Sequence, residues 1–441
     1  MASSLHQDHN AGFVAVHVGA GLHAARNKTR YLDACRKACQ AGTVLLRTDP
    51  TATCAAVVEH MIRILEDDPV TNAGIGSNLN LDGRVECDAS IMNGTTLGFG
   101  SVGAVSEFKN PISVAAKVLE ESDKGPLSLG RIPPTMLVGS GAGKWADTMD
   151  FALDRVQSSP YIPPTTSGDL VGGSSSGNMG SPINGSLVTH ESLQYHLRFQ
   201  EMLRNASTKE VPSKREAKEE EPSCQQQTEH SSTKRLAIGI IEDELLQDTV
   251  GAICVDRFGR VASGVSSGGI AMKFPGRVSE AAIFGAGCWA QDASETSAGF
   301  ACSMTGAGEQ ICKTLLAKSC METMVSEDDD TASAANTVLD HFMNNPLLRS
   351  YGEKHAGFIA AKVDPLGSDP NVIDSTATSG GCGAYPAATT APVRGDFVIA
   401  HTTKTMGVAY MSTRDERPKA MMSLRKPGLN KAVFIAAMRG Q

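Results

Sequence analysis

The junction between Asp248 and Thr249 constrains this chain more than any other feature of its sequence. Before it lies a long polar stretch with clustered charges, and after it the apolar segment 250–256 begins at once. That segment and 260–265 are typical of two strands joined by a tight turn, so a loop gives way to a strand at Thr249. Cleavage before Thr249 would leave a hydroxyl and a free α-amine on one residue, which is a known way to activate a weak nucleophile. Most Asp-Thr pairs have no such role, so the pair alone does not decide the matter.

Size and composition narrow the class of protein. At 441 residues, with 41% hydrophobic and 20% charged residues, the chain could form two or three average domains or one large α/β domain with insertions. Its net charge of −8 gives no basic field for direct binding of nucleic acid. The 11 cysteines form no CxxC pair, which favours reduced thiols over a zinc site. No apolar leader and no run of about 18 apolar residues is present. We therefore expect an intracellular protein without a membrane span, a metal or a cofactor.

The order of apolar segments predicts the fold class. Strand-then-helix sets occur on both sides of the junction, which favours packed sheets flanked by helices, an α/β architecture. Asp49 and Pro50 have the residue types of an N-cap and a first helical position, so a helix is expected to begin there. Further strands are expected at 13–18, 84–92, 101–106, 135–138, 281–286, 300–304, 357–363, 396–400 and 406–411, and further helices at 28–42, 110–121, 308–325 and 331–344.

The region before the junction is not uniform. Residues 1–248 divide into a core at 13–156 and an insert at 157–248, and the region after the junction is 249–441. The insert is rich in Ser, Gly and Pro and then in unpatterned charges, so it buries too little apolar surface to offset its ordering entropy. We therefore expect a mobile insert that contains one amphipathic helix at 190–205.

Several positions after the junction carry groups suited to hydrolysis. Ser267 ends the second strand of the hairpin, where it can lie beside Thr249. Arg277 lies in a Pro-Gly turn and could hold a carboxylate in a bidentate pair. Thr305 and Gly306 end a strand and offer a hydroxyl and a backbone N–H to an oxyanion. Each also has an ordinary alternative, as a turn hydroxyl, a surface charge or a helix cap.

Together these segments resemble a known family. The order Thr249-Val-Gly-Ala, Ser267-Gly-Gly, Gly276-Arg-Val and Thr305-Gly-x-Gly-Glu is similar to that of the plant-type asparaginase family of N-terminal nucleophile hydrolases. The earlier segments His17-Val-Gly-Ala-Gly21 and Asn72-Ala-Gly-x-Gly fit the same family. Within it, the variants at 71–81, 130–134, 265–269, 275–278, 287–290 and 401–403 look like those of the threonine aspartase branch, whose members cleave other proteins after aspartate. The resemblance extends from about residue 13 to 323 and weakly to 412.

The resemblance implies a four-layer αββα sandwich that cleaves itself between Asp248 and Thr249. The products would be an α chain, 1–248, and a β chain, 249–441, held together as a heterodimer that could pair into a heterotetramer. The roles it implies are Thr249 as nucleophile, Ser267 as its hydroxyl neighbour, Thr305 and Gly306 as oxyanion binders, Arg277 as carboxylate anchor and Asn72 as a polarising group.

For function, the resemblance implies a threonine endopeptidase that acts after aspartate. Its substrates would be nuclear transcription regulators with an Asp-Gly site, which implies a location in the nucleus, the cytoplasm or both. An L-asparaginase or isoaspartyl peptidase acting on small substrates is the first alternative, and a non-catalytic binding protein is the second. Glu280 bears on the choice and is a candidate substrate-binding residue, because asparaginases carry aspartate there to hold the substrate amine.

Overall fold

Two β-sheets form the centre of the computed structural model, which describes residues 11–23, 25–157, 180–209, 249–326, 330–365 and 393–438. The eight-stranded sheet has the order β12 (Lys419–Leu424), β11 (Thr405–Ser412), β1 (Phe13–Gly21), β5 (Val250–Val255), β6 (Val261–Ser267), β2 (Cys87–Asn93), β3 (Phe99–Val105) and β4 (Met136–Val138). The five-stranded sheet has the order β13 (Ala432–Ala437), β10 (Gly395–His401), β9 (Ala356–Val363), β8 (Gly299–Gly306) and β7 (Cys288–Gln291). Paired strands are antiparallel except for β3 and β4.

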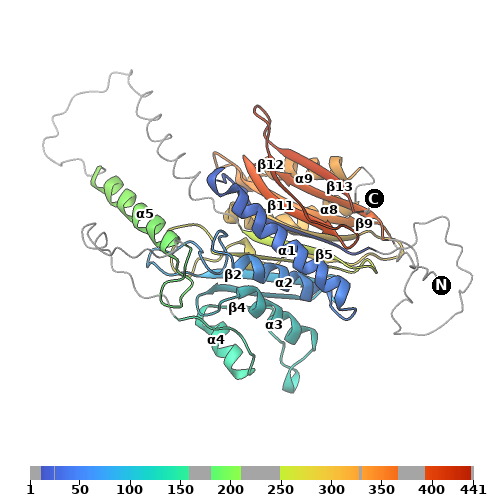
Figure 1. Cartoon of the computed structure of the whole chain (residues 1–441), viewed down its shortest axis with the longest axis horizontal. Coiled ribbons are helices and arrows are strands. Elements are labelled where there is room, and N and C mark those ends of the chain that lie inside the picture. Colours follow the sequence, from blue (N-terminus) through green and yellow to red (C-terminus); the bar gives the residue numbers. More distant parts are fainter. Residues whose placement is uncertain are drawn as a thin grey trace, which may run out of the picture.

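Helices cover the outer face of each sheet. The helices on the eight-stranded sheet are α1 (Lys28–Thr48), α2 (Cys54–Glu66), α3 (Pro111–Asp123) and α4 (Gly139–Thr148), and those on the five-stranded sheet are α8 (Leu316–Ser326) and α9 (Thr331–Met343). Figure 1 shows α1 and α2 in blue on one side of the sheets and α8 and α9 in orange on the other. The inner faces meet where β5 and β6 contact β8. The fold is therefore the expected four-layer αββα sandwich.

The strands at the centre of the larger sheet are buried on both faces. Along β5, Ile253 and Val255 belong to the apolar core between the two sheets, while Ala252 and Cys254 belong to the core under α1 and α2. Successive side chains of a strand point to opposite faces, so one apolar segment serves both cores. This burial explains why the strand that follows Thr249 could be predicted from its continuous apolar sequence.

The start of α2 and two edge strands differ from expectation. Thr53, rather than Asp49, is the N-cap of α2, and its side chain accepts a backbone N–H of the first turn. The Asp49 carboxylate instead accepts hydrogen bonds from the N–H and O–H of Thr51, and these bonds form a local turn before the helix. The strands β12 and β13 were not predicted, because both lie at sheet edges and have only partly buried side chains.

Two predicted elements after Ser267 are also wrong in part. The segment 281–286 is not a strand, and a short 3-10 turn, Glu280–Ala282, lies at its start. The helix expected at 308–325 is two helices, α7 (Gly308–Thr314) and α8, separated by Leu315 in a left-handed conformation with φ 44°. A leucine in that conformation ends α7, since it cannot continue the right-handed turn.

Part of the expected mobile insert is packed against the core. Residues 180–209 include the helix α5 (His190–Lys209), close to the predicted 190–205. Leu187 and Val188, just before it, are buried against Leu79 and Val85. In the sequence, the signal for this contact was the adjacent apolar pair Leu187 and Val188 within an otherwise polar region. The rest of the insert, 158–179 and 210–248, lies outside the described residues. In the part of the chain that is described, no helix is long and apolar enough to cross a bilayer.

Glu66, at the end of α2, is a fully buried carboxyl. Its Oε1 accepts the O–H of Ser266 at 2.6 Å and the N–H of Ile112 at 3.0 Å. Its Oε2 has no hydrogen-bond partner among the described residues. Burial raises the pKa of Glu66 to about 8, so the carboxyl is largely protonated in the fold at neutral pH.

The pKa of Glu66 predicts a pH dependence of stability. Between its ordinary value of 4.5 and about 8, the carboxyl ionises in the unfolded chain but stays protonated in the fold. Unfolding then releases a proton, so the free energy of unfolding falls as pH rises through this window. Glu66→Gln removes the contribution, which is on the order of a few kcal/mol. Urea unfolding of both proteins at pH 5 and pH 8 measures it, and an equal pH dependence in the two proteins would contradict it.

Candidate active site

Thr249 lies at the start of β5, at one end of the hairpin that β5 forms with β6. It is 4% exposed, and its Oγ1 lies 3.3 Å from Ser267 Oγ and 2.6 Å from Glu280 Oε1. The antiparallel pairing of Val250 with Ser266 brings Ser267 beside Thr249, although the two are 18 positions apart. A threonine hydroxyl has one proton, and the nearer carboxylate oxygen of Glu280 is a stronger acceptor for it than the Ser267 hydroxyl.

Glu280 is the acid of this cluster. It is 2% exposed, and burial raises its pKa above the ordinary value for glutamate, while the hydrogen bond from Thr249 acts in the opposite direction. Its turn is fixed by Asp88 of β2, whose two carboxylate oxygens accept the N–H of Ala104 and the N–H of Ser279, each at 2.8 Å. Asp88, which pairs with Ser267 across β2 and β6, thus ties the Glu280 turn to the ends of the central strands near Thr249.

Arg277 lies beside Glu280 and is mostly buried. Its Nε and Nη2 donate to Glu309 Oε1 at 2.9 and 2.7 Å, and its Nη1 is buried without a hydrogen-bond partner among the described residues. A Cβ added to Gly308 would lie 2.5 Å from Glu280 Oε2 and 2.8 Å from Arg277 Nη2, so glycine is needed where these groups converge. The unsatisfied Nη1 leaves the guanidinium with a donor for a carboxylate ligand.

Thr305 and Gly306 end β8, on the other sheet. Thr305 is fully buried, and its Oγ1 accepts the N–H of Ala20 at 3.2 Å. Because the oxygen acts as the acceptor in that bond, its own proton remains available for a second partner. Gly306 has φ 136°, a conformation that favours glycine, and it precedes the turn into α7. Neither residue has a direct hydrogen bond to the Thr249 side chain in the described structure.

Asn72 organises the loop that follows Ser267. Its Nδ2 donates to the carbonyl of Gly269 at 2.9 Å, and its own carbonyl accepts the N–H of Gly268 at 2.7 Å. Asn78 donates to the same Gly269 carbonyl at 2.9 Å. The two asparagines therefore fix the backbone that leads away from Ser267.

A buried hydrogen bond near Thr249 joins the two sheets. His17 of β1 and Ser303 of β8 meet through Nε2 and Oγ at 2.8 Å, and Ser303 also lies 3.1 Å from the carbonyl of Gly264. Burial lowers the pKa of His17 to about 3, so the ring is neutral at physiological pH. The contact crosses Gly251, two residues after Thr249, and a Cβ there would overlap both side chains.

Gly251→Ala should disrupt this contact and displace the start of β5. We expect the variant to be destabilised by about 2 kcal/mol or more, because a methyl group in a packed interior forces backbone and side-chain shifts. Since Thr249 is two residues away, any splitting of the chain before Thr249 should slow as well. Thermal unfolding and intact mass measure the two effects. Gly103→Ala, also within the larger sheet but with no atom nearer than 3.1 Å to the added Cβ, is the control. Equal behaviour of the two variants would contradict the prediction.

The structure brings some of the predicted site residues into contact with Thr249 and leaves others apart from it. Thr249, Ser267 and Glu280 are in direct contact, and Arg277 adjoins Glu280. Asp248 lies outside the described residues. Asp88, Glu309, His17 and Ser303 were given no role in the sequence analysis. The signal for Asp88 and His17 was an ionisable residue inside a predicted strand. In the described part of the chain, no group of three or more His, Cys, Asp and Glu side chains could hold a metal ion.

Comparison with known proteins identifies the family. The sequence matches the protein family described as Asparaginase over residues 10–160 and 169–364, which include every predicted site residue. The chain belongs to this family. Its members are N-terminal nucleophile hydrolases, so the protein is a hydrolase.

Individual relatives of the asparaginase family are similar over most of their length. A plant-type L-asparaginase of Pyrococcus abyssi is 33% identical over 409 residues, covering 92% of this chain and 98% of the relative. An isoaspartyl peptidase of Salmonella typhimurium is 29% identical, covering 70% of this chain and 77% of its own. An isoaspartyl peptidase/L-asparaginase of Mus musculus is 28% identical, with 74% and 77% covered.

Proposed function

We propose that this chain is a threonine hydrolase that cleaves itself between Asp248 and Thr249 and then acts as an endopeptidase after aspartate. The observation that carries the proposal is the position of Thr249 immediately before the core strand β5, with its hydroxyl 2.6 Å from a buried carboxylate and 3.3 Å from Ser267 Oγ. A hydroxyl so placed needs only a free α-amine on the same residue to act as an N-terminal nucleophile.

The self-cleavage step follows from these groups. Thr249 Oγ1 attacks the carbonyl carbon of Asp248, and its proton passes to a nearby acceptor such as Glu280. The bond from that carbon to the Thr249 nitrogen then breaks, the nitrogen takes up the proton, and the amide has become an ester. Water then hydrolyses the ester, which leaves a carboxylate on Asp248 and a free α-amine on Thr249. An α-amine has an ordinary pKa of about 7.7–8.0, so it can serve as general base for the next substrate.

The substrate step repeats the same chemistry on another chain. Thr249 Oγ1 attacks the α-carbonyl of the substrate aspartate, the bond to the next residue breaks and its amine leaves, and water hydrolyses the acyl-enzyme. The Thr305 hydroxyl and the Gly306 N–H are the proposed oxyanion donors, and Asn72 polarises the site through the loop it fixes. Arg277 Nη1, which is buried and unsatisfied, would hold the substrate carboxylate.

Two observations support the endopeptidase. The first is that Asp248 precedes Thr249, so the proposed self-cleavage would place an aspartate in the acyl position with its α-carbonyl attacked, which is also the arrangement needed for an Asp-Xaa peptide. Glu280 stands where asparaginases carry aspartate, and its extra methylene group brings the carboxylate onto Thr249. We propose protein substrates with an Asp-Gly site among nuclear transcription regulators, a location in nucleus or cytoplasm, and α/β pairing into a heterodimer or heterotetramer.

The second candidate is an L-asparaginase or isoaspartyl peptidase. The names of the relatives favour it, since all three proteins compared above carry one or both of these activities in their names. Glu280 is still an acid, and it could hold the amine of a small amino-acid substrate. In that reaction the side-chain amide is attacked and the α-carboxylate takes the place of the aspartate side chain at Arg277.

A matched panel of substrates separates the candidates. The split protein is given a peptide with Leu-Asp-Gly, the same peptide with Glu or Asn in place of Asp, free asparagine, and a β-aspartyl dipeptide. Products are measured by mass spectrometry and ammonia release, with Thr249→Ala as the blank. We expect cleavage of the Leu-Asp-Gly peptide alone. Faster ammonia release or dipeptide cleavage would replace the endopeptidase with the second candidate. An uncut chain inactive on every substrate would indicate a binding protein.

A further inference from the structure

A basic pocket lies at the opposite end of β5 from Thr249. It forms where the turn between β5 and β6 meets the connection from α1 to α2 and the segment that follows β11, and its volume is about 220 Å³. Seven residue steps separate Thr249 from Asp256 at this turn, which is about 23 Å along a strand. The pocket is therefore separate from the candidate active site.

The charge of this pocket is positive although the chain is acidic. Its lining includes the four arginines Arg47, Arg257, Arg260 and Arg414, against the two carboxylates Asp49 and Asp256. The whole chain carries a net charge of −8, so the cluster is a local exception. All four arginines are exposed, which keeps their guanidinium groups within reach of a ligand.

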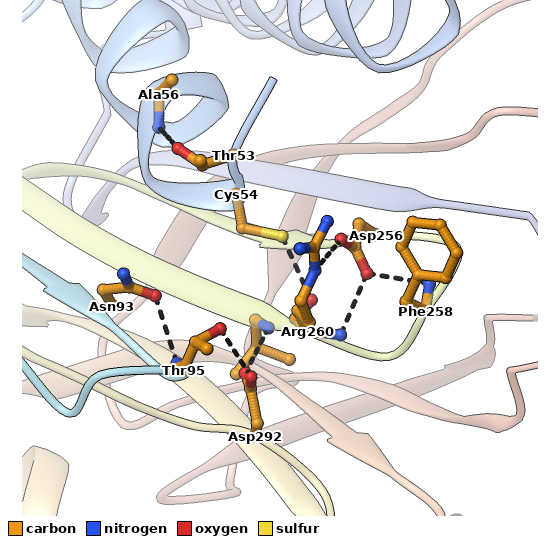
Figure 2. Close-up of polar contacts among 10 residues, drawn as sticks. Thr53, Cys54, Ala56, Asn93, Thr95, Asp256, Phe258, Arg260 and Asp292 are labelled. Carbon is orange, nitrogen blue, oxygen red and sulfur yellow. Dashed lines mark hydrogen bonds and ion pairs between the residues drawn. The ribbon is translucent and has the colours of Figure 1, made fainter. Parts of the chain in front are cut away.

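The acid at the centre of the turn is already satisfied. Asp256 accepts the backbone N–H of Phe258 at 2.8 Å, the N–H of Arg260 at 3.0 Å and the Arg260 Nε at 2.6 Å (Figure 2). Asp49 accepts the N–H and O–H of Thr51. Both carboxylates are held by local donors and keep their charge, so the lining with four arginines and two carboxylates has a net charge of +2.

Neutral partners hold further guanidinium groups of the pocket in place. Arg47 donates from Nε to the carbonyl of Thr413 at 2.7 Å and from Nη2 to the carbonyl of Asp415 at 2.6 Å, so it is fixed without losing its charge. Arg257 and Arg260 lie 4.8 and 5.1 Å from the centre of the Phe258 ring. Fixed arginines around an open cavity lose less conformational entropy on binding an anion than mobile surface lysines do.

We propose that this pocket is an exosite for an acidic segment of a protein substrate, held by arginine–carboxylate pairs. The proposal rests on the endopeptidase function, because only a polypeptide substrate could reach both sites. A fully extended chain spans at most about 3.6 Å per residue, so at least about seven residues must separate the acidic segment from the cleaved bond. The pocket volume of about 220 Å³ accommodates only a few side chains, which favours a short acidic peptide over a long polyanion.

Arg257 is the position at which to test the exosite. Its contact in the pocket is with the Phe258 ring, so Arg257→Glu reverses the charge without breaking the Arg260–Asp256 pair or the contacts of Arg47. Arg349, an exposed arginine after α9, provides the matched control Arg349→Glu. Equal thermal midpoints of the three proteins establish that each is folded.

Binding is measured with fluorescein-labelled hexaglutamate by fluorescence anisotropy at low salt, since this peptide has no aspartate to cleave. We expect Arg257→Glu to weaken binding about tenfold or more and Arg349→Glu to leave it unchanged. Equal binding by all three proteins, or no binding by the wild type, would overturn the exosite. Binding of inorganic phosphate, measured by calorimetry, together with no affinity for hexaglutamate would also overturn it, in favour of a phosphate site.

Cleavage provides the second readout. Arg257→Glu should lower kcat/KM about tenfold through KM for a substrate with an acidic segment ten residues from Asp-Gly, and should leave a short Leu-Asp-Gly peptide unaffected. An equal loss on both substrates would overturn the exosite, since it would indicate damage to the catalytic site. Because hexaglutamate binding needs no catalysis, a protein that binds it but cleaves neither substrate would refute the endopeptidase and leave the anion site established.

Discussion

Thr249→Ala should leave the chain uncut between Asp248 and Thr249 and should abolish hydrolysis of every substrate. The substitution removes the hydroxyl that lies 2.6 Å from Glu280 Oε1, and no other described side chain occupies that position at the start of β5. We expect self-cleavage to be undetectable and hydrolysis to fall by at least about a thousandfold, the scale of losing a nucleophile. Intact mass after a day at neutral pH gives the first result directly.

Thr249→Ser is the control for this prediction. Serine keeps the hydroxyl and would keep the α-amine, but it lacks the methyl group that fixes the rotamer of a β-branched side chain. We expect it to split more slowly than the wild type and still to split. An alanine variant that yields two chains would disprove Thr249 as the nucleophile, because the cleavage would then have another cause.

Glu280→Gln should slow self-cleavage about a hundredfold at neutral pH, a typical loss for a positioned proton acceptor. The amide that replaces the carboxylate keeps the shape of the side chain but cannot take the proton of Thr249. Burial raises the pKa of Glu280, so in the wild type the rate should fall on acidification at a pH above the ordinary value for glutamate. The acid limb of the rate profile should disappear in Glu280→Gln, as measured by the time course of splitting between pH 4 and pH 9.

Glu280→Asp keeps the carboxylate but shortens the side chain, so it tests the position of the acid rather than its charge. The shorter side chain draws the acid away from Thr249 Oγ1 and restores the residue that asparaginases carry. We expect slower splitting together with a gain in ammonia release from asparagine relative to cleavage at Asp-Gly. An acid limb that persists unchanged in Glu280→Gln would show that another group titrates.

The fold was largely predictable because its strands are buried on both faces. The segments at 13–18, 300–304 and 357–363 are apolar at all but one or two positions, and each corresponds to a strand. The N-cap at Thr53 was not predictable from residue type, since Asp49 is an equally good cap and only its use on Thr51 excludes it. The break at Leu315 depends on how α7 and α8 pack and has no local signal.

The site was predictable only for contacts that follow from local pairing. Ser267 lies beside Thr249 because a hairpin brings them together, and the turn is readable in the sequence. Glu280 contacts Thr249 directly because Asp88, which is distant in sequence, accepts the N–H of Ser279 and holds the turn that carries Glu280. Nothing in the spacing of these residues specifies that contact. The bond between His17 and Ser303 spans two sheets whose packing angle is a property of the whole fold.

The order of strands in the larger sheet has a consequence for the two polypeptides that cleavage before Thr249 would produce. The strand β1, from the first polypeptide, lies between β11 and β5 of the second, while β5 and β6 of the second lie between β1 and β2 of the first. The halves are interleaved strand by strand and share one hydrogen-bonded ladder. Dilution should therefore not separate them, and neither half should fold when expressed alone. Maturation would be a nick within one folding unit, and the partners would part only when the whole molecule unfolds.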